Sequence, residues 1–185
     1  MDKIVCLVGE SGSGKSTITE LLEKEGYNYI QSYTTRKPRF EGEKGHIFIG
    51  DSNIAYINGT ISKNELTSDV IAYTFFNGNH YWATKEQYQG KGISVYIIDP
   101  SGVKYLKEKV TDAETVVIYL KCDKEVRLLR MLKERDPKAV RDRLKNDREV
   151  FKIIQCDYVV DSNRKVEEIL EDVKSIIGGE IFSIE

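Results

Sequence analysis

The chain has 185 residues, of which 40% are hydrophobic and 31% are charged, and its formal net charge at pH 7 is −2. This composition is typical of a globular protein and argues against a disordered chain. A general nucleic-acid surface needs a strongly basic face, so the charge also argues against a nucleic-acid polymer as partner. The length fits one domain, residues 1–185, with one substantial core and a smaller lobe.

The first strand pattern begins directly after Met-Asp-Lys, without a cleavable signal or a long apolar segment. We therefore expect a cytoplasmic protein that does not bind a membrane. Cys6, Cys122 and Cys156 are odd in number and lack paired metal-ligand spacing, so we expect small buried residues in a reducing compartment. The sequence leaves open whether the protein is a monomer or a homodimer, and what its tail, residues 178–185, does.

An apolar run from Lys3 to Val8 ends at Gly9, the pattern of a strand buried on both faces of a parallel sheet. Apolar residues then recur at helical spacing from Lys15 to Glu25, and Gly26 is the expected stop. Strand and helix patterns alternate again in the second half, which predicts an α/β fold with a parallel sheet flanked by helices. The expected strands there are 93–99, 115–121 and 158–160, and the expected helices are 102–109, 123–134, 138–154 and 166–177.

Between residues 33 and 89 the pattern changes to short alternating or aromatic runs separated by Gly, Asn and Asp. We interpret this segment as a small mixed β lobe inserted into a core formed by residues 1–32 and 90–185. Asn58-Gly59 and Asn77-Gly78 fit the turns of β-hairpins in the lobe. Residues 133–150 are predicted to form a helical lid.

Residues Gly9 to Ser16 match the phosphate-binding pattern Gly-x-x-x-x-Gly-Lys-Ser and lie between a strand and a helix. Glycines let the backbone curl so that its N–H groups point at phosphate oxygens, and the next helix adds its positive N-terminal end. We expect Lys15 to reach the β and γ phosphates of ATP, Ser16 to place its hydroxyl on Mg²⁺, and Thr17 to flank the α phosphate. The predicted ATP site comprises Gly9, Glu10, Ser11, Gly12, Ser13, Gly14, Lys15, Ser16 and Thr17.

A second motif, Ser-Tyr-Thr-Thr-Arg-Lys-Pro-Arg, runs from Ser32 to Arg39 and is followed by Gly42-Glu43. Further on, Gly78-Asn79-His80-Tyr81 and Asp99-Pro-Ser-Gly-Val complete a set that, with the P-loop, resembles the guanylate kinase family over nearly the whole chain. The resemblance implies a P-loop kinase fold that moves a phosphoryl group from ATP to a nucleoside monophosphate, with Mg²⁺ as the cofactor.

The resemblance also implies roles for single residues. Ser32, Arg36, Arg39 and Tyr81 match the positions that hold the acceptor's phosphate, and guanidinium forks suit a phosphate chemically. His46 stands where a phosphate-binding tyrosine is usual, and it either donates to phosphate or faces solvent. Asp99 is expected to touch the acceptor or, with Ser16, to help order the metal ion and its waters.

Residues 121–149 hold eleven Lys and Arg against seven Asp and Glu, so the basic charge gathers in the predicted lid. Arg135 and Arg143 lie where the family places arginines on the transferring phosphates. Such charges stabilise the negative charge that spreads over oxygens in the transition state. Together with Lys15 and Arg36 they form the predicted catalytic set, although arginines on an exposed helix face can serve solubility alone.

The guanine-reading positions depart from the family pattern. Ala72 and Ala83 stand where the family has an acidic residue and a small hydroxyl residue that contact guanine, and neither alanine side chain can form a hydrogen bond. Asp69 could replace the missing acid only if the strand register shifts. Trp82 replaces a glycine and is expected in the lobe's core rather than stacked on a base. Ile97 replaces an aspartate that is usual in the family two residues before Asp99.

Three functions stay open at this point. The first is a nucleoside monophosphate kinase, with GMP and dGMP as the family's default acceptors and the base preference unsettled. The second keeps the fold and the ATP site but uses another small phosphorylated acceptor, such as a modified nucleotide or a phosphosugar. The third is a non-catalytic module that binds phosphorylated peptides, which would be expected to carry a decayed P-loop rather than the intact Lys15-Ser16 pair.

Overall fold

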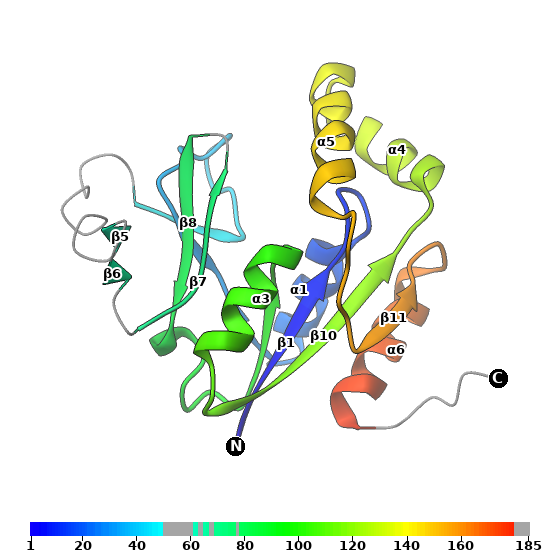
Figure 1. Ribbon diagram of the computed structural model, residues 1–185. Coiled ribbons are helices and arrows are strands. Elements are labelled where there is room, and N and C mark those ends of the chain that lie inside the picture. Colours follow the sequence, from blue (N-terminus) through cyan, green and yellow to red (C-terminus); the bar gives the residue numbers. More distant parts are fainter. Residues whose placement is uncertain (50–60, 63–64, 67–68, 77, 180–185) are drawn as a thin grey trace.

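The structure is a computed structural model that describes residues 1–49, 61–62, 65–66, 69–76 and 78–179. Its centre is a five-stranded sheet in the order β11-β10-β1-β9-β2, and every neighbouring pair in it is parallel. This confirms the α/β class, and Figure 1 shows β1 in the middle of the sheet. The strands are β1 (Asp2–Val8), β2 (Asn28–Ile30), β9 (Ile93–Ile97), β10 (Ala113–Lys121) and β11 (Tyr158–Asp161).

Alternate residues of β1 face two separate layers of the core. Val5 and Leu7 pack in one cluster with apolar residues of α1 (Lys15–Lys24) and α6 (Val166–Gly178). Ile4, Cys6 and Val8 pack in the other cluster, with α3 (Pro100–Lys109) and with buried residues of the second sheet, Ile71, Ala72 and Ala83. Both faces of the sheet are therefore covered, which explains why β1 reads as a continuous apolar run. Among the described helices, none combines the length and apolar character needed to cross a bilayer.

The inserted segment forms a second, mixed sheet in the order β4-β3-β8-β7. Strands β3 (Ser32–Thr34) and β4 (His46–Phe48) are parallel, whereas β8 (Asn79–Thr84) pairs antiparallel with β3 and with β7 (Val70–Phe76). A separate antiparallel pair joins β5 (Ile61–Ser62) to β6 (Glu65–Leu66). A 3-10 helix, η2 (Lys85–Gln87), leads back towards the central sheet.

Strands β7 and β8 form the predicted hairpin and pair up to Phe76 and Asn79, while Asn77 of the predicted turn lies outside the described residues. The turn predicted at Asn58-Gly59 lies outside the described residues. Trp82 is fully buried and stacks on Tyr33 with 5.5 Å between ring centroids, so it belongs to the core of this sheet as expected.

Helix α4 (Lys124–Leu132) precedes the predicted lid, residues 133–150, and helix α5 (Pro137–Val150) falls within it. Both helices lie beyond the end of β1 (Figure 1). Asp136 begins α5, since its carboxylate accepts hydrogen bonds from the N–H groups of Lys138 and Ala139 at 3.0 Å. The helix ends four residues before the predicted Ile154. Beyond its end, Phe151 and Ile154 pack against the core cluster on the α3 side, so the apolar pattern continues although the helix does not.

The start of α3 also differs from the prediction. Asp99 was expected to end a strand, but it is the N-cap of α3 and its carboxylate accepts a hydrogen bond from the N–H of Gly102 at 2.8 Å. Pro100 occupies the first helical turn, where its missing N–H costs nothing. The strand therefore ends at Ile97 and the helix begins two residues earlier than predicted.

Gly102 fills a tight position where α3 packs on the end of β9. An added Cβ there would lie 2.6 Å from Cγ1 of Ile98. We expect Gly102→Ala to lower the free energy of unfolding by about 1–3 kcal/mol, measured by urea denaturation. Gly178→Ala is the matched control, because its Cβ would meet nothing within 4 Å. Equal stability of the two variants would contradict this account.

Candidate active site

The loop between β1 and α1 is shaped by its glycines. Gly12 and Gly14 adopt positive φ angles of 82° and 95°, which favour glycine. A Cβ on Gly12 would also lie 2.8 Å from the backbone oxygen of Arg127, and one on Gly9 would lie 2.6 Å from Oγ of Ser13. The neighbouring elements therefore close around this loop so tightly that larger residues do not fit, and the predicted phosphate-binding turn is formed.

The side chain of Lys15 folds back over the mouth of the loop. Its Nζ donates to the backbone oxygens of Gly9 at 2.5 Å and Glu10 at 3.1 Å. Burial lowers the pKa of Lys15 from 10.5 to about 8, against the opposing charges of Asp147 and Glu10. The amine is thus held where a phosphate would meet it. Ser16 and Thr17 follow in the first turn of α1, and both are exposed.

Side chains from α4 and from the loop after β11 form hydrogen bonds with the backbone of the P-loop. Arg130 donates to the backbone oxygens of Gly12 at 3.4 Å and Ser162 at 2.9 Å. The Ser162 hydroxyl in turn donates to the backbone oxygen of Ser13 at 2.5 Å. These bonds tie the loop to the last strand of the sheet and restrict its movement.

The arginines of the second motif are held by one carboxylate. Glu43 accepts two hydrogen bonds from Arg36, at 2.8 and 3.1 Å, and one from the N–H of Arg39 at 2.6 Å. Burial alone would raise the pKa of Glu43, but the bonds and charges of the two arginines lower it to about 2. Arg36 also lies over the ring of Phe48, with 5.1 Å from its Cζ to the ring centroid. The Arg36 side chain is thereby fixed before any anion arrives.

A cavity of about 250 Å³ lies between the second sheet and the central sheet. Four of the predicted acceptor residues line it: Ser32, His46, Tyr81 and Asp99. The Ser32 hydroxyl lies 3.0 Å from the phenol oxygen of Tyr96, which is also in the lining. Burial, and then the charge of Arg36, lowers the pKa of His46, so the ring is neutral rather than cationic near pH 7.

Asp99 contributes the only carboxylate to the described lining of this cavity. Its Oδ1 accepts hydrogen bonds from Ser101 and Gly102, and its Oδ2 accepts one from the Thr74 hydroxyl at 3.2 Å. The group is therefore already engaged as a helix cap, with the Thr74 side of the carboxylate facing the cavity.

A larger cleft of about 770 Å³ joins the three predicted parts of the site. Ser11 lines it from the P-loop, Arg36 and Arg39 from the second sheet, and Arg143 from α5. Burial, and then the charges of Arg135 and Arg39, lowers the pKa of Arg143. A cluster of like positive charges forms an environment suited to a polyanion.

Arg135 is less engaged than Arg143. It is absent from the described lining of the cleft, and it pairs with Glu134 at 3.4 Å on the surface. Its charge still acts on Arg143, so it lies near the site without facing it in this conformation.

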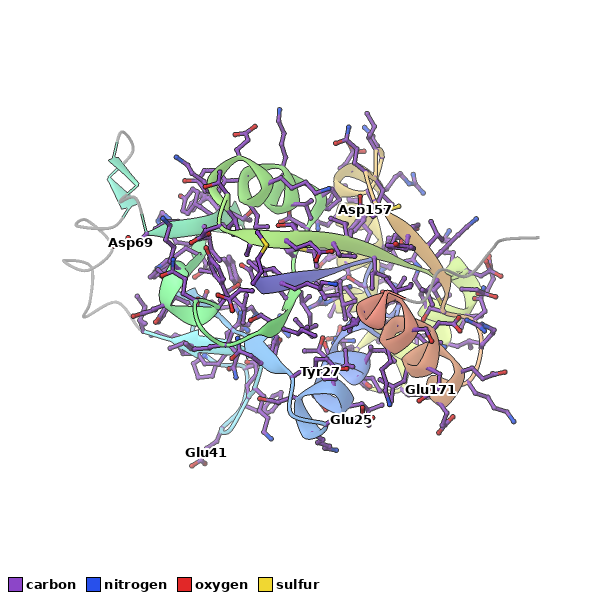
Figure 2. All side chains as sticks on the ribbon, turned by 90° about the horizontal axis from the view of Figure 1, so that it is seen from below. Glu25, Tyr27, Glu41, Asp69, Asp157 and Glu171 are labelled. Carbon is purple, nitrogen blue, oxygen red and sulfur yellow. The ribbon has the colours of Figure 1, made fainter. Side chains whose placement is uncertain are left out.

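The two guanine-reading positions are paired across strands β7 and β8. Ala72 and Ala83 are partners in the ladder, both are buried, and Ala72 lines the smaller cavity. Asp69 does not take the place of an acid there: it is exposed, it is not in the described lining, and Figure 2 shows it at the outer end of β7. The base end of the cavity is accordingly apolar at Ala72.

Sequence reasoning missed a buried charged pair beside the P-loop, Arg127 on α4 and Asp147 on α5, at 3.1 Å. One signal was present, because Arg127 occupies the same helical face as Met131, which is fully buried. A charged residue on an apolar face needs a partner, and the sequence does not reveal which of the lid's acids supplies it.

The whole chain can be compared with known proteins. The guanylate kinase family model matches residues 1–180. A guanylate kinase from Helicobacter pylori is 30% identical over 94% of this chain and 84% of its own length, and one from Mycoplasma genitalium is 28% identical over 97% and 77%. The crystal structure of guanylate kinase from Anaplasma phagocytophilum has the same fold, with a TM-score of 0.64 and 20% identity over 98% of this chain and 87% of that one.

A parallel sheet, a formed P-loop and an arginine-lined cleft together define a P-loop phosphotransferase. The chain belongs to the guanylate kinase family, as its motifs predicted. It is accordingly an ATP-dependent nucleoside monophosphate kinase.

The pKa of Lys15 predicts an alkaline limit on ATP capture. The amine is positive below about pH 8 and loses its charge above it, so kcat/KM for ATP should fall about tenfold per pH unit above that value. Steady-state kinetics at saturating acceptor measure this. Lys15→Arg, which stays protonated, should lack the decline even if its plateau is lower. A wild-type profile that is flat to about pH 10 would refute the prediction.

Proposed function

We propose that the chain transfers the γ-phosphoryl group of ATP to the phosphate of a nucleoside monophosphate across the 770 Å³ cleft, and that it discriminates weakly among bases. The cleft carries the first part of the proposal, because it joins the P-loop to two arginines of the acceptor side and one of the lid. Two anions bound at its two ends would face each other, which is the arrangement that in-line transfer needs.

On the acceptor side, Arg36 and Arg39 bind the phosphate of the monophosphate, assisted by the hydroxyls of Ser32 and Tyr81. The bidentate bonds between Glu43 and Arg36 support this role, because they present the guanidinium in a fixed orientation. His46 contributes a neutral ring nitrogen rather than a positive charge, since its pKa is lowered.

On the donor side, the P-loop amides and Lys15 bind the β and γ phosphates. Arg143, with Arg135 after lid movement, stabilises the charge on the transferring group. The acceptor phosphate attacks the phosphorus directly, so the chain needs no covalent intermediate. The protein aligns the acceptor phosphate with the γ phosphate of ATP and excludes water from the cleft.

Mg²⁺ fits this site through a small donor set. The ion prefers few protein ligands and several waters beside the nucleotide phosphates. Ser16 is exposed directly after Lys15 and offers its hydroxyl. The described residues contain no cluster of three His, Cys, Asp or Glu that would hold a metal alone, which agrees with binding of the ion together with the nucleotide. Asp99 acts there through ordered water, because its carboxylate also caps α3.

We infer weak base discrimination from the cross-strand pair of Ala72 and Ala83, of which Ala72 lines the smaller cavity. Guanine presents two neighbouring donors, and a side-chain carboxylate would pair with them both. Ala72 cannot, and Asp99 is already bonded to three groups. Loss of one charge-assisted hydrogen bond removes about 1.5–3 kcal/mol of discrimination. The same observation favours the alternative of a phosphorylated acceptor other than a standard nucleotide.

A phosphopeptide-binding module without catalysis is a poorer fit, because the P-loop turn is formed and its lysine faces the mouth of the loop. We expect the enzyme to work in a reducing, cytoplasmic compartment, since its three cysteines are free thiols and two of them are buried. Whether it acts as a monomer or a homodimer is a separate question for sedimentation.

An ADP-release assay over GMP, dGMP, IMP, AMP, CMP, UMP and dTMP tests the proposal. We expect turnover of GMP with less than about tenfold preference over IMP, which lacks the 2-amino donor. Ala72→Glu should increase that preference about 10–100-fold, and Ala72→Gln, without the charge, should increase it less. A wild-type preference above about 100-fold would disprove weak discrimination. No turnover with any nucleotide would favour the other phosphorylated acceptors.

Glu43 should act on the acceptor side alone. Glu43→Ala frees Arg36 and Arg39, so KM for the acceptor should rise about tenfold while KM for ATP stays constant. Glu41→Ala, at a neighbouring exposed position, is the matched control and should change neither value. Parallel increases in both KM values would show that Glu43 supports the whole fold instead of the acceptor arginines.

A further inference from the structure

Arg127 and Asp147 form a buried ion pair that joins helices α4 and α5. Their side chains are 8% and 7% exposed, and Nη1 of Arg127 lies 3.1 Å from Oδ2 of Asp147. Arg127 also donates to the backbone oxygen of Cys122 at 3.3 Å, at the start of α4. The pair therefore fixes α5 to α4 through groups that have little access to water.

The same pair is bonded to the P-loop. The carboxylate of Asp147 accepts hydrogen bonds from the N–H of Ser11 at 2.9 Å and from its hydroxyl at 3.1 Å. Arg127 donates to the backbone oxygen of Ser11 at 3.2 Å and lies 3.7 Å from Glu10. Glu10 is held in turn by the phenol of Tyr119 at 2.9 Å. Ser11 is thus hydrogen-bonded through its N–H and its hydroxyl to Asp147 on α5, and through its carbonyl oxygen to Arg127 on α4.

Asp147 and Arg143 are four residues apart on α5 and so project from the same side of the helix. Arg143 lines the large cleft, whereas Asp147 and Arg127 line a different pocket of about 400 Å³ with Glu10. The ion pair therefore does not face the reacting groups. It can act on them through its bonds to Ser11, through the charge of Asp147 on Lys15, and by setting the position of α5.

We propose that Asp147 is a positioning residue: through Ser11 and Arg127 it anchors α5 on the P-loop and thereby directs Arg143 at the transferring phosphoryl group. The proposal rests on the proposed role of Arg143. A purely structural role explains the pair less well, because buried ion pairs can often be replaced by apolar residues without loss of stability. Their bonds to Ser11 link the lid to the loop that binds phosphate, which apolar residues cannot do.

Asp147→Ala should lower kcat about 10–100-fold, because small misplacements of a catalytic group have effects of this size. KM for the acceptor should stay within about twofold, since no acceptor residue contacts the pair. Asp147→Asn should restore most of the rate, as its amide oxygen can accept from Ser11 and Arg127. The comparison uses the kcat plateau on the acid side of the Lys15 titration, because Asp147 raises the pKa of Lys15 and its loss should move the alkaline decline to lower pH. Glu167→Ala, an exposed acid on α6, controls for the charge change.

A double variant separates positioning from stability. Arg127→Met with Asp147→Leu removes both charges and keeps the volume, so its melting temperature should stay near that of the wild type while kcat remains as low as in Asp147→Ala. Recovery of kcat together with stability would overturn the proposal, as would a wild-type kcat in Asp147→Ala or an Asp147→Asn enzyme as slow as the alanine variant. Arg143→Ala is measured in parallel. Wild-type activity of Arg143→Ala would disprove the proposed role of Arg143. An inactive Arg143→Ala together with a fully active Asp147→Ala would refute only the proposal that Asp147 positions α5.

Discussion

The tight turn after β1 is the constraint on which the rest of the structure depends. Gly12 and Gly14 need positive φ, and no Cβ fits at Gly9 or Gly12, so the chain has a single way to pass from strand to helix there. The central position of β1 puts this turn at the carboxyl edge of a parallel sheet, where open α/β folds bind ligands. The second sheet, α4 and α5 all lie around that edge, and each contributes one group of charges to it (Figure 1).

Electrostatics explains the arrangement of those charges. Arg36, Arg39 and Arg143 line one cleft, and like charges at close range repel one another. Two carboxylates outside the described lining of the cleft, Glu43 and Asp147, are negative neighbours of these arginines and offset the repulsion. Glu43 accepts hydrogen bonds from Arg36 and Arg39. Asp147 pairs with Arg127 and accepts hydrogen bonds from Ser11 in the P-loop. The unliganded protein thus keeps its cations oriented, and an arriving polyanion replaces repulsion with attraction at little reorganisation cost.

The features that short, contiguous sequence patterns determine were predicted most accurately. β1, the P-loop and α1 form a contiguous signal. The motif from Ser32 to Arg39 predicts the acceptor side by resemblance, and its two arginines line the large cleft. Boundaries were less accurate where two rules competed: Asp99 follows an apolar strand but caps a helix, and Phe151 continues an apolar pattern after α5 has ended. The Arg127–Asp147 pair was not predictable, because its partners are 20 residues apart and only packing of α4 on α5 brings them together.

Two buried alanines limit what the smaller cavity can recognise. The buried alanine pair, Ala72 and Ala83, offers no side-chain hydrogen bond at these two positions, while Arg36 and Arg39 line the large cleft. Binding energy is then concentrated at the phosphate, which all nucleoside monophosphates share. Under the proposed function, such an enzyme gains rate from the alignment of two anions and little selectivity from the base. An apolar wall rejects a polar group less strongly than a hydrogen-bonding site rejects a substrate that lacks the matching group.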